Sequence, residues 1–120
     1  QYRQRELEWL RQVVKTPEVA DAPVKICLIH IPAFTGPDSW YTQNWIAENF
    51  TPALNEAGID LMLSGHHHKY IYAAPGEYGN RFPIVANSNT ERMDVHVTPG
   101  RIEVKAFDRE GKLVRSLEIK

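Results

Sequence analysis

Two short apolar runs, each followed closely by a histidine, constrain the fold of this chain more than any other feature. The first run is Val24–Ile29, which His30 follows directly. The second is Ile59–Leu63, which His66 follows after one serine and one glycine. Both runs are too short for a typical helix and too continuously apolar for a strand with one face in water. We therefore expect two strands that are buried on both faces.

The connection between the two runs indicates that the strands are parallel. Antiparallel neighbours can be joined by a tight hairpin, whereas the stretch from Pro32 to Gly58 is long and includes a predicted helix over about Asn44–Ala57. We expect this helix to be broken at Thr51-Pro52, where Thr51 caps a fresh turn, and to be closed by Gly58. The sequence thus predicts a right-handed strand-helix-strand crossover.

The histidines should then gather at one edge of the predicted sheet, because parallel strands end at the same edge. Neutral imidazole is the commonest protein ligand for zinc and similar metals. Residues i and i+2 of an extended backbone point to the same side, so His66 and His68 should converge while His67 points elsewhere. We predict that His30, His66 and His68 surround one or two metal ions. A polar loop that is merely rich in histidine is the alternative.

The flanking segments predict further helix and strand. Residues Arg3–Lys15 have the apolar spacing of a surface helix, and Thr16-Pro17 should end it. After Tyr70 the pattern is that of strands, with Ile71–Ala74 pairing with Pro83–Ala86. A three-stranded meander is expected from Met93 to Ile119, because apolar and polar residues alternate between the turns. We expect an α/β fold and one partial domain over residues 1–120, with the parallel unit in 1–70 and the β strands in 71–120.

Composition excludes several classes of partner. The net charge is -1, with Lys+Arg 14 against Asp+Glu 15, so there is no electrostatic footprint for nucleic acid or an anionic membrane. No apolar run approaches the ~20 residues of a membrane span.

The single cysteine, Cys27, cannot form an internal disulfide and is expected to be a small core residue. The amino end has neither an initiator methionine nor a signal-peptide pattern, so we expect the chain to come from something longer.

The run from Lys25 through His30 and Pro32, a loop and a helix, and then Gly65-His66-His67-His68 resembles a known family. It is similar to the carboxy-terminal half of calcineurin-like metallophosphoesterases, particularly the purple-acid-phosphatase-like branch. This resemblance covers about residues 1–70 and implies the C-terminal half of an αββα sandwich that holds two metal ions, Mn, Fe or Zn. It also implies that His30 and His66 bind the second metal and His68 the first.

The chain departs from the family pattern at several points. The earlier motifs Asp-x-His, Gly-Asp and Gly-Asn-His do not precede His30, so half of the metal ligands are missing. Ile31 stands where the family often has a second histidine. Asp94-Val95-His96 imitates Asp-x-His but comes after the triple histidine, so we interpret it as part of a strand that faces solvent.

For the parent protein the resemblance implies an enzyme that hydrolyses phosphoesters. Paired metals neutralise the phosphate charge, orient the phosphate, and lower the pKa of a bound water. His67 is the candidate catalytic residue, contacting the phosphate or donating a proton, although a solvated rim residue is equally expected. The aromatic loop Ala33–Gln43 either selects the substrate or covers the core, with equal weight. The isolated chain should bind metal weakly or not at all and should be inactive.

The alternative function is a non-catalytic β-rich module, in which the histidines hold a structural zinc or no metal. Sequence upstream of Gln1 that carries the absent motifs would favour the enzyme. The partners expected for the chain are the missing amino-terminal half of its own domain and a phosphoester substrate. Without that half, Val24–Ile29 and Ile59–Leu63 expose apolar strand edges, so we expect the chain to self-associate as a homodimer.

Overall fold

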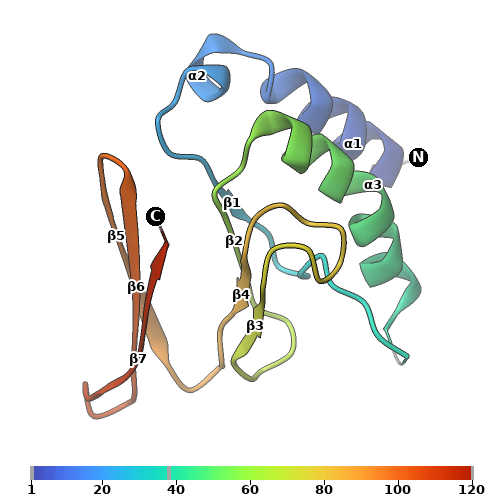
Figure 1. Cartoon of the computed structure of the whole chain (residues 1–120). Coiled ribbons are helices and arrows are strands. Elements are labelled where there is room, and N and C mark those ends of the chain that lie inside the picture. Colours follow the sequence, from blue (N-terminus) through green and yellow to red (C-terminus); the bar gives the residue numbers. More distant parts are fainter. Residues whose placement is uncertain (1, 38, 120) are drawn as a thin grey trace.

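The computed structural model describes residues 2–37 and 39–119, which form three layers (Figure 1). Helices cover one face of a four-stranded sheet, and a three-stranded sheet covers the other face. The mixed α/β class is therefore confirmed. In chain order, the elements are α1 (Tyr2–Val13), α2 (Pro17–Ala20), β1 (Ile26–Leu28), α3 (Tyr41–Ala57), β2 (Leu61–Ser64), β3 (Ile71–Ala73), β4 (Ile84–Ala86), β5 (Arg92–Thr98), β6 (Arg101–Phe107) and β7 (Leu113–Ile119).

The four-stranded sheet has the order β1-β2-β4-β3. Strands β1 and β2 are parallel, with Ile26 opposite Leu61, and α3 connects them, so the predicted crossover is confirmed. Strand β4 pairs antiparallel with β3, as expected, and also parallel with β2. The sequence did not predict that second pairing, which places β2 and β4 at the centre of the sheet.

The second sheet is the predicted meander, β5-β6-β7, with all strands antiparallel. Ile102 and Val104 of β6 are buried, while Glu103 and Lys105, which alternate with them, lie on the opposite face. This alternation follows from the two-residue period of a strand. One face of the meander therefore packs on the central sheet and the other faces water.

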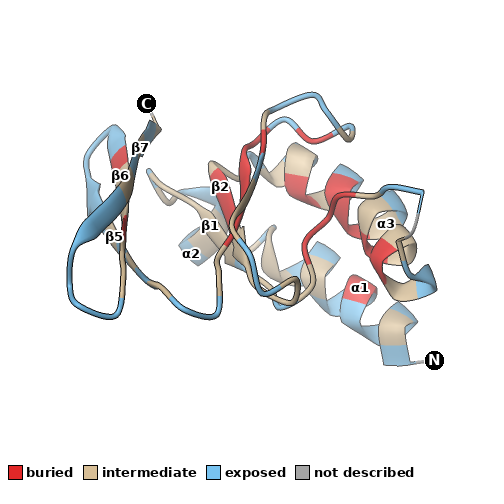
Figure 2. Ribbon diagram, turned by 90° about the horizontal axis from the view of Figure 1, so that it is seen from below, coloured by how far each residue is buried: buried red, intermediate tan, exposed pale blue. Residues whose placement is uncertain are grey.

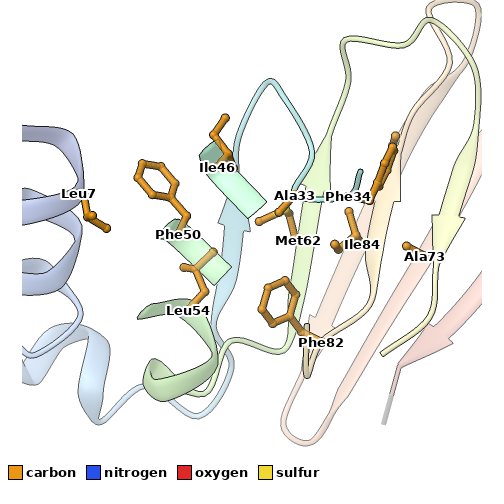
Figure 3. Close-up of a cluster of buried hydrophobic side chains, with 11 residues drawn as sticks. Leu7, Ala33, Phe34, Ile46, Phe50, Leu54, Met62, Ala73, Phe82 and Ile84 are labelled. Atoms are coloured by element: carbon orange, nitrogen blue, oxygen red, sulfur yellow. The ribbon is translucent and has the colours of Figure 1, made fainter. Parts of the chain in front are cut away.

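Two apolar cores lie on the two faces of the central sheet. The core between the helices and the sheet contains Leu7, Phe50, Leu54 and Met62 (Figure 3). The core between the two sheets contains Leu61, Val85, Ile102 and Val104. Adjacent residues of β2, Leu61 and Met62, thus enter different cores, and the prediction that Ile59–Leu63 forms a strand buried on both faces is confirmed for β2.

Helix α3 differs from the expectation. It starts at Tyr41 and continues through Pro52, so the predicted break is wrong. Thr51 Oγ1 is buried and has no hydrogen-bond partner among the described residues, so it caps no fresh turn there. Phe50 and Leu54, on either side of the proline, are buried in the core, and packing of this kind can outweigh the local cost of a proline inside a helix. Gly58 ends the helix as predicted, with φ at 75°.

Strand β1 also differs from the expectation. Val24–Ile29 was predicted to be buried on both faces, but β1 is an edge strand and Leu28 is 76% exposed. The physical reason is the strand order, which leaves one edge of β1 without a neighbour among the described residues (Figure 2). The short helix α2, which was not predicted from the sequence, has Pro17 at its first position, where a proline is favourable.

Within the described residues, no helix is long and apolar enough to cross a membrane.

Candidate functional site

His30 and His66 meet at the carboxyl edge of the parallel strands. Backbone pairing continues past the strand ends, because Ile29 N–H donates to Leu63 at 3.1 Å and Gly65 N–H donates to the carbonyl of His30 at 3.0 Å. These bonds bring His66 Nδ1 within 3.3 Å of His30 Nε2, with the ring centroids 5.1 Å apart and the rings nearly perpendicular. A hydrogen bond between two imidazoles requires one nitrogen to donate and the other to accept, so at least one ring is neutral.

The backbone of the triple histidine is not extended. His66 and His68 have positive φ angles, 75° and 61°, and the N–H of His67 donates to the carbonyl of Gly65 at 2.9 Å. The rule that residues i and i+2 share a side therefore does not apply, and it cannot bring His66 and His68 together. The positive φ angles of this turn lie on His66 and His68 and not on Gly65. His68 is exposed.

Two imidazoles alone do not fit the predicted metal centre. A structural zinc is held by four protein ligands, and a hydrolytic metal pair needs bridging and terminal ligands for both ions. In residues 2–37 and 39–119, no group of three or more histidine, cysteine, aspartate or glutamate side chains could hold a metal ion. His30 and His66 are together, and His68 is not grouped with them. Metal binding by the three histidines stays a prediction.

His67 turns toward the ring of Phe34. The two rings stack at 5.3 Å between centroids with an interplanar angle of 24°. Burial, followed by the positive charges possible at His66 and Lys69, lowers the pKa of His67 and favours its neutral form. Its Nε2 atom is buried and lacks a hydrogen-bond partner within the described part of the chain. A catalytic role for His67 stays a prediction.

Asp94 and His96 lie in the other sheet, on β5. Both are exposed, as expected for strand residues facing solvent. Asp94 forms an ion pair with Arg92 at 2.9 Å, and His96 stands opposite Glu103 of β6. The resemblance of this segment to Asp-x-His therefore comes from strand alternation.

Sequence reasoning singled out the aromatic loop Ala33–Gln43, with Trp40 among its residues, but it did not name Phe34. The structure shows that Phe34 covers the core, while selection of a substrate by this loop stays a prediction. Phe34 is 7% exposed and covers the core, whereas Trp40 is 65% exposed and lies edge-on to His66 at 5.0 Å between centroids. The aromatic composition of the loop was the available signal. Asp38 of this loop lies outside the described residues.

Comparison with known proteins supports the fold and no family. No protein-family model matches the chain, and no curated protein matches it. A solved structure described as GAP50, the anchor in the inner membrane complex of Plasmodium, is similar with a TM-score of 0.67 and 14% sequence identity. The match covers 98% of this chain and 42% of that one, so this chain spans about two fifths of the solved protein.

These comparisons correct the family assignment made from the sequence. The order of His30 and the Gly-His-x-His motif suggested a calcineurin-like metallophosphoesterase, but no such family model matches, and the similar solved protein is described as an anchor. Gly-His-x-His is a short pattern that unrelated chains can contain. At 14% identity the likeness shows the fold alone.

Proposed function

We propose that this chain is a non-catalytic binding module, whose histidine edge completes no catalytic metal centre by itself. The observation that carries the proposal is the donor set: His30 and His66 are in contact at 3.3 Å, and no third metal-binding side chain joins them among the described residues. The fold likeness to a protein described as an anchor is compatible with a binding module.

The open surface around the histidine edge supports the same proposal. His30, Trp40 and Tyr41 are all exposed, and the last two present large aromatic rings to solvent. Exposed aromatic residues are enriched at binding interfaces because they bury much area at a small entropy cost. An active site for phosphoester hydrolysis would instead need charged groups that neutralise the phosphate.

Hydrolysis assays test this proposal directly. We expect no turnover of p-nitrophenyl phosphate or bis(p-nitrophenyl) phosphate by the purified chain with added Mn²⁺, Fe²⁺ or Zn²⁺. The matched variants are His66→Ala, which removes one ring of the contacting pair, and His96→Ala, which removes an exposed histidine of the other sheet. Metal-dependent turnover that is lost in His66→Ala and kept in His96→Ala would refute the proposal.

The second candidate function is that of a metal-dependent phosphohydrolase. One observation favours it, the contact between two imidazoles at the carboxyl edge of parallel strands. This edge is where α/β folds commonly bind ligands. In a longer protein, further residues could supply the missing donors and make a metal-dependent phosphohydrolase. A longer protein that hydrolyses phosphoesters, with activity lost in His30→Ala and His66→Ala, would favour this function over the binding module.

A further inference from the structure

A hollow of about 610 Å³ lies on the side of His66 where the aromatic loop approaches the triple histidine. Three separate segments form its wall: the loop after β1 with the start of α3, the loop between β2 and β3, and the loop between β3 and β4. The lining residues that matter for binding are Phe34, Trp40, Gln43, His67, Lys69 and Tyr78. A volume of this size accommodates a small organic ligand.

Aromatic rings form one continuous wall of this hollow. Phe34 stacks on His67 and also contacts Tyr78, with centroids 5.8 Å apart and an interplanar angle of 40°. The buried amide of Gln43 donates to the backbone carbonyl of Phe34, which fixes the loop on helix α3. Such a wall is preformed, so a ligand ring that stacks on it loses little entropy to protein ordering.

Trp40 also lines the hollow. Its ring is nearly perpendicular to that of His66, at 86°, and the residue is 65% exposed. A large aromatic side chain that is exposed to this extent offers apolar surface for stacking.

The described lining residues of the hollow carry one formal charge, and it is positive. Lys69 is exposed and is the only lysine, arginine, aspartate or glutamate among the described lining residues. An anionic group in the hollow would therefore meet the ammonium group of Lys69, and no carboxylate belongs to the described lining residues.

We propose that this hollow binds a flat aromatic ligand that carries one negative charge. The ring stacks against Trp40 and the Tyr78 side of the wall, and the anion contacts the ammonium group of Lys69. This inference goes beyond the proposed function, because it requires no metal at the His30–His66 pair and names the chemistry of a ligand.

Calorimetric titration with two ligands of the same shape tests the charge. The probes are 2-naphthoate and its neutral analogue 2-naphthamide. We expect 2-naphthoate to bind with a Kd in the millimolar range, as is usual for a ligand of this size. Its affinity should exceed that of the amide by about threefold to tenfold. Equal affinity for both probes, or no saturation by about 10 mM naphthoate, would overturn the proposal.

Two pairs of variants test the location. Trp40→Ala should weaken the binding of both probes about tenfold. Trp9→Ala, which truncates an exposed tryptophan of α1, should leave the affinity for both probes unchanged. Lys69→Gln should remove the preference for naphthoate, whereas Lys15→Gln, which removes an exposed lysine elsewhere, should keep it. Because all four side chains are exposed, the fold should survive each change. Equal effects within either pair would show that binding occurs outside this hollow.

Discussion

At the scale of single residues, the triple histidine stands out because two of its members have left-handed backbone. His66 and His68 lie at φ of 75° and 61°, a region that costs roughly 1–2 kcal/mol for residues other than glycine. His66 has ring contacts with His30 and Trp40 that offset this cost. His68 is exposed, so its backbone conformation follows from the turn that its neighbours impose.

We predict that His68→Gly is more stable than His68→Ala by about 1 kcal/mol, because glycine adopts a positive φ without steric strain. Urea denaturation of the two variants measures the difference. Both remove the same imidazole, so loss of the side chain cancels in the comparison. Equal midpoints with equal slopes would show that the φ of His68 is not maintained in solution.

Cys27 is a second residue whose chemistry depends on its surroundings. It is partly buried against the core beneath the helices, and burial raises its pKa from 9.0 to about 11. A thiol is the neutral form, so the folded chain holds this proton more tightly than the unfolded chain does. Its contribution to stability is complete below pH 9 and is lost as the pH rises from 9 toward 11.

At pH 8, we predict that the thiol of Cys27 reacts about 100-fold more slowly in the folded chain than in the unfolded chain, since its thiolate is rarer by that factor. The measurement is the rate of labelling by a disulfide reagent, with and without urea. Cys27 is the single cysteine of the chain, so the signal is unambiguous. Equal rates in the two states would contradict the burial of this side chain.

At the scale of elements, helix α3 positions much of the molecule. Ile46, Phe50 and Leu54 enter the core, Gln43 holds the aromatic loop, and Pro52 occupies the helix interior. A proline there removes one backbone hydrogen bond and presses on the carbonyl of the preceding turn. The core contacts of the helix keep it continuous.

Pro52 is exposed, and its ring disfavours the helical backbone around it. We therefore predict that Pro52→Ala raises the free energy of unfolding by about 1–2 kcal/mol. The unfolded state gains freedom on losing proline, so the net effect falls below the full helix penalty of ~3 kcal/mol. Thermal and urea unfolding provide the measurement. Glu56→Ala, at an exposed position of the same helix, is the control and should change stability by less than about 0.5 kcal/mol.

At the scale of the whole molecule, the central sheet has an open edge at β1. Strand β1 has β2 on one side and no described strand on the other, and Leu28 is 76% exposed. Ile26–Leu28 contains no charge or proline, the features that commonly protect an edge strand. The homodimer expected from the sequence would cover this edge.

Self-association through β1 stays a prediction, and sedimentation equilibrium tests it. We expect a dimer at high micromolar concentration, and we expect Leu28→Lys to shift the chain toward monomer because a buried ammonium at the new interface is unfavourable. Leu113→Lys changes an exposed leucine of the other sheet and should leave the association unchanged. A wild-type chain that is monomeric throughout would contradict the prediction.

The sequence by itself determined the features that depend on local pattern. Continuous apolar runs specified β2 as a buried strand, a long helical connection made β1 and β2 parallel, and alternation specified β5, β6 and β7. Gly58 ended α3 because a left-handed residue closes a helix most easily as glycine. Each of these features is set by residues close together in the chain.

Only the tertiary structure decided the features that depend on distant neighbours. It placed β4 beside β2, kept α3 continuous through Pro52, and made β1 an exposed edge. It also brought the ring of His66 into contact with that of His30. The left-handed backbone at His66 and His68 means that these two side chains do not share one side of an extended strand, as had been expected. The physical reason is that packing energy and strand order come from contacts between segments far apart in sequence, and these contacts can exceed a local conformational cost of about 1–3 kcal/mol.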